Sequence, residues 1–168
     1  AVTKSRKGLV GNMDKQAVIS ILDFYKNIDD EIVLKKRAIA ELEARYYSVI
    51  GSINYDGMPK AKGQTSSPTE NAVLNVPEWA AKEMEILQQE QKALCQVKMA
   101  IRKELNGLPY VQRTVVLLFY IEGRQWVHIA AQIHYSERQC KNIRDYALDK
   151  LSLRFATNDV IAKYSFPK

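Results

Sequence analysis

Apolar residues recur at alternating spacings of three and four over the first third of the chain, from about Asp14 to Val49. A repeat that averages about 3.5 residues is typical of one buried seam on a long α-helix that packs against another helix. Its positions are Val18, Ile21, Tyr25, Ile28, Ile32, Lys35, Ile39, Leu42 and Tyr46. Lys35 is the only charged member, and Gly51 follows where a helix C-cap is expected.

A second repeat with the same spacings predicts another long helix, from about Glu78 to Leu105. Its positions are Met84, Leu87, Gln91, Leu94, Lys98, Ile101 and Leu105, of which Gln91 and Lys98 weaken the seam. Two long helices joined by a loop favour an antiparallel helical hairpin over 13–106. Its apolar seams are completed either within the chain or by a second subunit, so we interpret the hairpin as an oligomerisation region.

The segments around this hairpin have a different composition. Residues 51–66 are rich in Gly, Pro, Ser and Asn and predict a loop. The run SPTE at 67–70 has the residues of a helix start, but Pro77 allows only a short helix there. Residues 1–12 show no period and carry Lys4, Arg6 and Lys7, so we interpret them as a basic flexible tail.

Three shorter helical units follow within 107–152. The first runs from Pro109 to about Ile121 and ends before Gly123, and the second runs from Gln125 to Ile133. After His134 and Tyr135, the third runs from Ser136 to about Leu151. We interpret 153–168 as a C-terminal tail or a short helix. The expected fold class is all-α: the hairpin followed by a three-helix unit.

The third unit has a well-specified start and two different faces. Ser136 can accept a hydrogen bond from the backbone N–H of Gln139, whose side chain can return the bond. The apolar stripe is Cys140, Ile143, Ala147, Leu148 and Leu151. The opposite face presents Glu137, Arg138, Lys141, Asn142 and Asp145, with Gln139 alongside.

A capped helix that offers these polar groups near its N-terminus suits the DNA major groove. Arginine and lysine can donate to guanine, and asparagine or glutamine can pair with adenine. We therefore expect base contacts from Arg138, Gln139, Lys141 and Asn142. The inward face of the preceding unit is formed by Trp126, Ile129, Ala130 and Ile133. Arg124 and Gln125, at its N-terminus, are placed to contact a phosphate, and we expect Ser136 to be a further phosphate contact. The spacing is that of a helix-turn-helix.

The segment LPYVQRTVVLLFYIEGRQWVHIAAQIHYSERQCKNIRDYALDKL resembles region 4 of bacterial sigma factors. The matching positions are Leu108-Pro109, Arg113, Gly123, Ile129-Ala130, Ser136, Ile143, Ala147-Leu148 and Leu151. The resemblance implies that Glu137, Arg138, Gln139, Lys141 and Asn142 align with positions that read the promoter −35 element. His134 departs from the pattern, because the family has Gly in this turn, and a positive φ at His134 costs more than at Gly.

The wider layout resembles small phage and prophage regulators of the ArpU/RinA kind. It combines a long first helix, the Asn-Tyr-Asp-Gly-Met-Pro loop, a Ser-Pro-Thr segment, a second helix and the region 4-like end. The resemblance implies a role in transcription and contact with RNA polymerase as a further partner. No second module resembles the sigma region that melts the promoter, so we do not expect a complete sigma factor.

Charge and composition add weaker constraints. The net charge of +6 permits binding to nucleic acid or an acidic membrane surface without establishing either. The longest apolar runs fall short of the roughly 20 residues of a membrane span, and no signal-peptide pattern opens the chain, so we expect a protein of the bacterial cytoplasm without a membrane partner.

We expect no catalytic residue, metal site or cofactor, and no enzyme activity. Cys95 and Cys140 lack ligand spacing and sit at apolar helix positions, which favours buried free thiols. His128 and His134 lack a third ligand at metal spacing. The acidic run 29–31 occupies consecutive helix positions and therefore does not converge on one site.

Three functions remain in order of preference. The first is a sequence-specific transcription regulator that binds double-stranded DNA as a homodimer or higher homo-oligomer. The second is a DNA-packaging component like a small terminase subunit, which also joins a helix-turn-helix to helical oligomerisation segments. The third is an adaptor that docks on polymerase and contacts no DNA.

Overall fold

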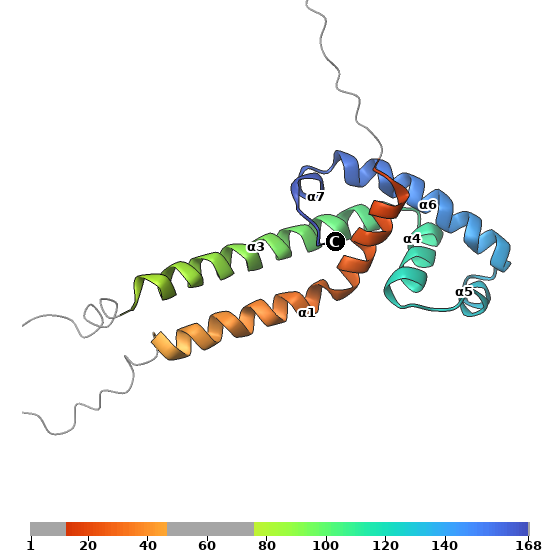
Figure 1. The fold of residues 1–168 in the computed structure, drawn as a ribbon. Helices are drawn as coiled ribbons and strands as arrows, with labels where there is room; N and C mark the ends of the chain where they lie inside the picture. Colours follow the sequence, from red (N-terminus) through yellow and green to blue (C-terminus); the bar gives the residue numbers. More distant parts are fainter. Residues whose placement is uncertain (1–12, 47–75, 168) are drawn as a thin grey trace, which may run out of the picture. The chain divides into compact units, whose positions relative to one another are not determined.

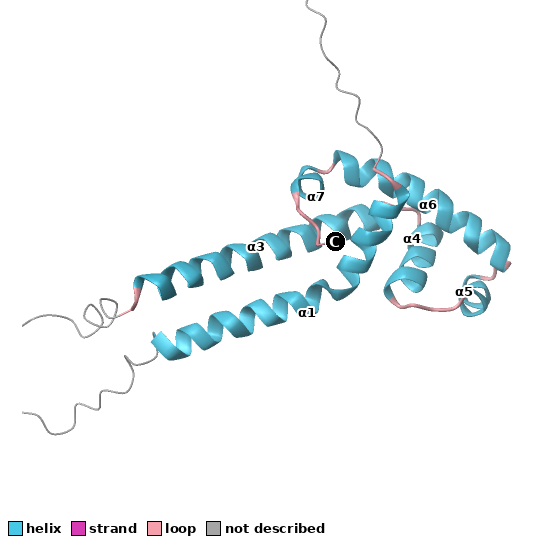
Figure 2. Cartoon of the chain, viewed as in Figure 1, coloured by secondary structure: helices cyan, strands magenta, loops and turns pink. Residues whose placement is uncertain are grey.

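The computed structural model describes residues 13–46 and 76–167, and every regular element in these ranges is helical (Figures 1 and 2). The elements in chain order are α1 (Lys15–Tyr46), α3 (Glu78–Asn106), α4 (Tyr110–Val116), the π-helical turn η2 (Leu117–Ile121), α5 (Trp126–Ile133), α6 (Glu137–Thr157) and α7 (Asp159–Lys163). The predicted all-α class is therefore confirmed. The interpretations of 1–12 as a tail, 51–66 as a loop and 67–70 as a helix start lie outside the described residues.

The chain divides into two compact units, and each long helix contributes to both of them. We call 13–29 together with 95–167 the large unit, and 30–46 together with 76–94 the helix-pair unit. This division differs from the expected boundary between a hairpin over 13–106 and a separate unit over 107–152. The reason is that Leu22 of α1 and Ile101 of α3 are fully buried within the large unit, where the C-terminal helices also lie.

In the helix-pair unit the segments of α1 and α3 run antiparallel. The ammonium of Lys35 forms an ion pair with the carboxylate of Glu90, and the rings of Tyr46 and Trp79 meet edge to face with centroids 5.4 Å apart. Ile32, Ile39, Ala80, Met84 and Leu94 are buried between them. Lys35, the one charged member of the predicted seam, is half-buried and keeps its charge paired.

The large unit has a core to which α1, α3, α4 and α6 each contribute buried apolar side chains. The largest fully buried side chains of this unit are Val18, Leu22, Ile28, Val97, Ile101, Val115, Val116, Ile129, Cys140, Leu151, Phe155 and Ile161. The second charged seam position, Lys98, forms an ion pair with Asp29 of α1. Both seams thus keep the burial that their spacing predicts, and each of the two seam lysines has a carboxylate partner.

The run from Pro109 to Ile121 is not one regular α-helix. It changes from α4 into η2, where the backbone N–H of Glu122 reaches the carbonyl of Leu117, five residues back, at 3.0 Å. Gly123 then takes φ +66°, a conformation that favours glycine, and ends the run as its position predicts. A π turn of this kind rotates the following residues relative to the helix before it.

Residues 153–167 contain a short helix, which was one of the two expected alternatives, and they are packed and not a free tail. α6 continues to Thr157, the side chain of Asn158 caps α7 by accepting from the N–H groups of Val160 and Ile161, and Phe155 and Ile161 are buried. Beyond α7, Tyr164 and Phe166 place their rings 5.7 and 5.2 Å from that of Phe24 of α1. The apolar stripe of α6 extends past Leu151 to Phe155, and this extra turn carries the end of the chain back onto the core.

Within the described ranges, none of the helices combines the length and the apolar character needed to span a bilayer.

The folded C-terminal segment makes a stability prediction. Phe155 is fully buried, whereas Leu153, two residues earlier on the same helix, is 50% exposed. Phe155→Ala should lower the free energy of unfolding by about 3–5 kcal/mol, because it leaves a cavity in the core. Leu153→Ala should change it by about 0.5 kcal/mol or less. Urea titration followed by circular dichroism measures both; equal small effects would show that 153–167 is not part of the folded core.

Candidate functional site

The turn between α5 and α6 is short and has one residue in the left-handed region (Figure 1). His134 has φ 58° and ψ 40°, and its N–H and that of Tyr135 both donate to the carbonyl of Ala130. Among the described residues it is the only non-glycine with a positive φ. His134 therefore has a positive φ at the turn position where the sigma region 4 pattern has Gly. A non-glycine residue adopts this conformation at a steric cost, and the turn that sets the direction of α6 carries that cost.

Ser136 begins α6 through the predicted reciprocal cap. The N–H of Gln139 donates to the Ser136 hydroxyl at 3.2 Å, and the N–H of Ser136 donates to the Gln139 side-chain carbonyl at 3.0 Å. The Ser136 hydroxyl also lies 3.0 Å from that carbonyl. The cap is confirmed, and it occupies the hydroxyl of Ser136 and the side-chain oxygen of Gln139. Of the polar atoms of Gln139, the amide nitrogen is the one left for a ligand.

The apolar side of α6 is braced by α4, η2 and α5. Val115, Leu118, Ile129 and Cys140 form a buried cluster. The residues packed around it are Phe119, Trp126, Ala130, Ile133 and Ile143. Both the predicted stripe of α6 and the predicted inward face of α5 are thus confirmed. Removal from water raises the pKa of the Cys140 thiol, which keeps it neutral and fits a packing role.

An aromatic stack continues this bracing to the edge of α6. The rings of Phe119 and Trp126 are stacked with centroids 4.2 Å apart, and the guanidinium of Arg144 lies 5.4 Å from the Trp126 ring centre. Arg144 also forms an ion pair with the neighbouring Asp145 at 2.7 Å. α6 is therefore held from both its apolar stripe and one flank.

The opposite face of α6 is open. Glu137, Arg138, Lys141 and Asn142 are all exposed, as the pattern predicts. Within the part of the chain that the structure describes, the side chains of Arg138, Lys141 and Asn142 make no hydrogen bond or ion pair. Two cations and an amide therefore project from the first two turns of a fixed helix with their donors free.

Arg124 and Gln125 lie at the N-terminus of α5, where the sequence places them. Gln125 is the exposed N-cap residue, and its side chain makes no capping hydrogen bond. Arg124 Nε is 2.7 Å from the carboxylate of Glu122, and both side chains are about half exposed. The sequence did not indicate this ion pair, which orients Arg124 but leaves the terminal guanidinium nitrogens available. Arg124 also borders an open depression on the outer side of α5, lined further by His128, Ala131 and Gln132.

Two carboxylates lie on the outward face of α6 beyond Asn142, and each forms an ion pair with a cationic side chain. Asp145 pairs with Arg144, and Asp149 pairs with Lys15 of α1 at 2.7 Å. The hydrogen bond to Asp149 raises the pKa of Lys15 above its ordinary value. The helical spacing from Asp145 to Asp149 is visible in the sequence, but no sequence signal links Lys15 to them, because the pair depends on tertiary packing.

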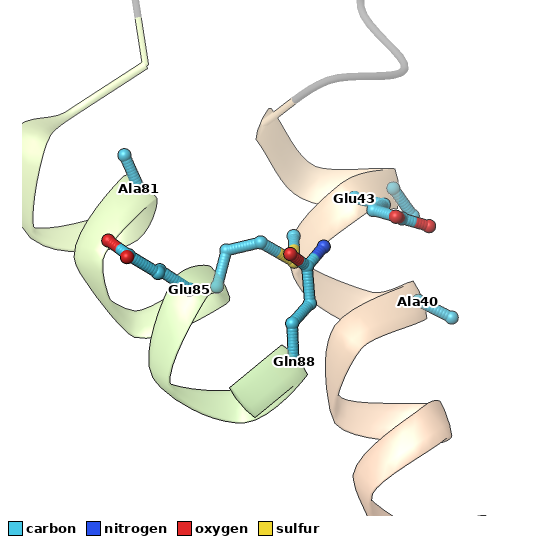
Figure 3. Close-up of a pocket in the computed structure, with 7 residues that line it drawn as sticks. Ala40, Glu43, Ala81, Glu85 and Gln88 are labelled. Carbon is cyan, nitrogen blue, oxygen red and sulfur yellow. The ribbon is translucent and has the colours of Figure 1, made fainter. Parts of the chain in front are cut away.

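The helix-pair unit has a separate open groove between α1 and α3 (Figure 3). It is lined by Ala40, Glu43, Ala44, Ala81, Met84, Glu85 and Gln88. Figure 3 shows small side chains and carboxylates in this region, without a cation among the lining residues. In the described ranges, no three His, Cys, Asp or Glu side chains come together as a metal site would require. Because its lining brings together carboxylates, small side chains and an amide without a cation, we consider the outward face of α6 the better candidate site.

Comparison with known proteins leaves this site to be interpreted from its own chemistry. Neither family models, nor curated proteins, nor solved structures give a match to the chain. The class that the structure establishes is an all-helical protein with a capped helix whose polar face is exposed.

The turn at His134 makes a prediction that needs no ligand. His134→Gly should leave the free energy of unfolding unchanged or raise it by up to about 1 kcal/mol, because glycine adopts a positive φ without steric cost. Tyr135→Gly, at a neighbouring residue without a positive φ, is the control and should lower it by at least about 0.5 kcal/mol. Thermal and urea unfolding give the comparison; equal losses in the two variants would contradict the left-handed turn.

Proposed function

We propose that this protein is a sequence-specific DNA-binding transcription regulator of the phage or prophage type. In this proposal α5, the turn at His134 and α6 act as a sigma region 4-like helix-turn-helix on double-stranded DNA. The observation that carries it is the free polar face of α6. Arg138, Lys141 and Asn142 are exposed and unpaired on a helix whose start is capped and whose other side is buried.

The chemistry of this face fits base recognition. A major groove about 12 Å wide admits one α-helix. Arg138 and Lys141 carry donors suited to guanine O6 and N7, and Asn142 can pair with adenine. Because the side chains project from a braced helix, binding needs to order these side chains but not the backbone that carries them. Glu137 adds an acceptor that suits cytosine N4.

Phosphate contacts come from the start of α5 in this proposal. Arg124 and the N-terminal backbone of α5 after Gln125 provide donors to an anion. Ser136 and Gln139 have a narrower role than their sequence positions indicate, because their oxygens serve the cap. Gln139 retains the amide nitrogen as a donor, and Ser136 acts mainly by fixing the start of α6.

One recognition helix buries too little surface for tight binding, so we propose a homodimer or higher homo-oligomer. The helix-pair unit supports this with exposed apolar side chains, since Leu34, Trp79 and Ile86 are 56%, 57% and 50% exposed. The same observation favours the second candidate function, a DNA-packaging component that binds as an oligomeric ring. The transcription-regulator proposal also includes contact with RNA polymerase, which the resemblance to sigma region 4 implies.

The DNA-binding proposal is tested with duplexes that the full chain selects from a random-sequence pool. Arg138→Ala combined with Lys141→Ala should weaken binding to a selected duplex by about 1–3 kcal/mol for each bidentate base interaction that the substitutions remove. The matched control is Lys82→Ala combined with Lys92→Ala, which removes two exposed cations from the helix-pair unit. Fluorescence anisotropy at fixed salt measures both variants.

The control separates base reading from total charge. If both double variants lose affinity equally, the effect is long-range electrostatics and α6 is not the reading helix. Unchanged affinity in the Arg138/Lys141 variant would likewise remove this face from the proposal. No selected sequence at all would contradict sequence-specific binding.

Stoichiometry distinguishes the two candidate functions. Analytical ultracentrifugation at micromolar protein, with and without the selected duplex, should give a dimer on DNA for the transcription regulator. A closed ring of many subunits would support the packaging component in its place. A monomer in both states would contradict either assembly.

A further inference from the structure

The outward face of α6 continues beyond the proposed base-reading residues as a line of two carboxylates. Arg138, Asn142, Asp145 and Asp149 follow at spacings of four, three and four residues, which places them on one side of the helix. At a rise of about 1.5 Å per residue, Asp149 lies roughly 10 Å beyond Asn142. A duplex that lies along α6 past Asn142 would bring phosphates closer to these carboxylates than the Debye length at physiological salt, about 8 Å, so screening would leave part of the repulsion.

Unpaired carboxylates at these positions would oppose a polyanion that lies along α6. The duplex carries about one negative charge per 1.7 Å of its axis, so repulsion from two carboxylates is felt at several phosphates. Asp145 is neutralised from within α6 by Arg144. Asp149 is neutralised from outside α6, by Lys15 of α1 at 2.7 Å.

Backbone contacts fix Lys15 beside Asp149. The N–H of Met13 donates to the carbonyl of Ser152 at 3.4 Å, and the Ser152 hydroxyl donates to the carbonyl of Met13. Ser152 is only 4% exposed, and Val18, one turn after Lys15, is fully buried. The start of α1 is therefore attached to α6 within one turn of Asp149, and the ion pair is built on this attachment.

From this geometry we infer that the start of α1 belongs to the DNA-facing surface, where Lys15 acts as a positioning residue that neutralises Asp149. The inference rests on the proposed DNA binding through α6. In it, α6 presents cations and an amide over its first two turns, and two carboxylates neutralised by ion pairs on the same side of the next two. Lys15 reads no base; it removes a repulsion that would lift the duplex away from Arg138 and Asn142.

A double-variant cycle on the full chain tests this role with a selected duplex. Lys15→Ala should weaken binding about three- to fivefold at low salt, since it exposes an unpaired carboxylate near the phosphates. Asp149→Asn should bind as well as the unaltered chain or better. The combined variant should bind within about twofold of Asp149→Asn alone, because Lys15 has no carboxylate left to neutralise.

The control cycle uses an equivalent exposed pair elsewhere. Lys82 and Glu78 form an ion pair at 2.6 Å in the helix-pair unit, and Lys82→Ala, Glu78→Gln and their combination should each leave the affinity within about twofold. The loss in Lys15→Ala should also shrink above about 0.3 M salt, because screening removes the repulsion. A urea titration of each variant reports whether a loss of binding instead follows a loss of folding.

Three results would overturn the inference. The first is full affinity in Lys15→Ala. The second is an equal loss of affinity from Lys15→Ala with and without Asp149→Asn, which would mean that Lys15 touches a phosphate directly. The third is a loss of affinity that follows a loss of folding. These outcomes leave the proposed function standing if binding still depends on Arg138 and Lys141. If the unaltered chain selects no duplex, the proposed function fails first, and this inference fails with it.

Discussion

The burial of one side of α6 against α5, η2 and α4 is the interaction on which the exposed polar face of this helix depends. Ile129 and Cys140 are each fully buried at this interface. Their burial fixes which side of α6 faces away from the protein. With the cap at Ser136 defining where the helix begins, both the direction and the rotation of its polar face are set before any ligand arrives. A binding surface that is already in place loses less conformational entropy on association.

The two halves of the polar face of α6 differ in whether their charged side chains are paired. Near its N-terminus, α6 leaves Arg138, Lys141 and Asn142 unpaired, whereas further along Asp145 and Asp149 are both paired. A surface that has free hydrogen-bond donors next to neutralised carboxylates suits an anionic partner with a groove. Because Lys15 comes from α1, this surface is assembled by the fold and is not contained in α5 and α6 alone.

The sequence predicted those elements whose spacing directly reflects burial. The seams of the two long helices, the stripe of α6 and the reciprocal cap of Ser136 and Gln139 follow from local rules, and the structure has each of them. The glycine break at Gly123 follows from backbone sterics in the same way. The positive φ at His134 does not, because sterics disfavour it at histidine, and only the family's Gly at that turn position pointed to it.

The remaining features depend on contacts between residues far apart in the chain. The run VVLLFYI is uniformly apolar, so it contains no period from which the π turn could be read. Phe155 extends the stripe of α6, but only its burial beside other elements shows that 153–157 is helical and contributes a core residue. The sharing of α1 and α3 between two units, and the pair of Lys15 with Asp149, arise from tertiary packing that neither composition nor spacing encodes.

In the function that we propose, the exposed N-terminal turns of α6 meet DNA directly. An amide chemical-shift titration of the isotope-labelled full chain with a selected duplex tests this residue by residue. We expect the largest shifts at 137–142 and at the start of α5, and no shifts at 82–92 in the helix-pair unit. Shifts confined to the helix-pair unit, with 137–142 unaffected at saturation, would contradict it.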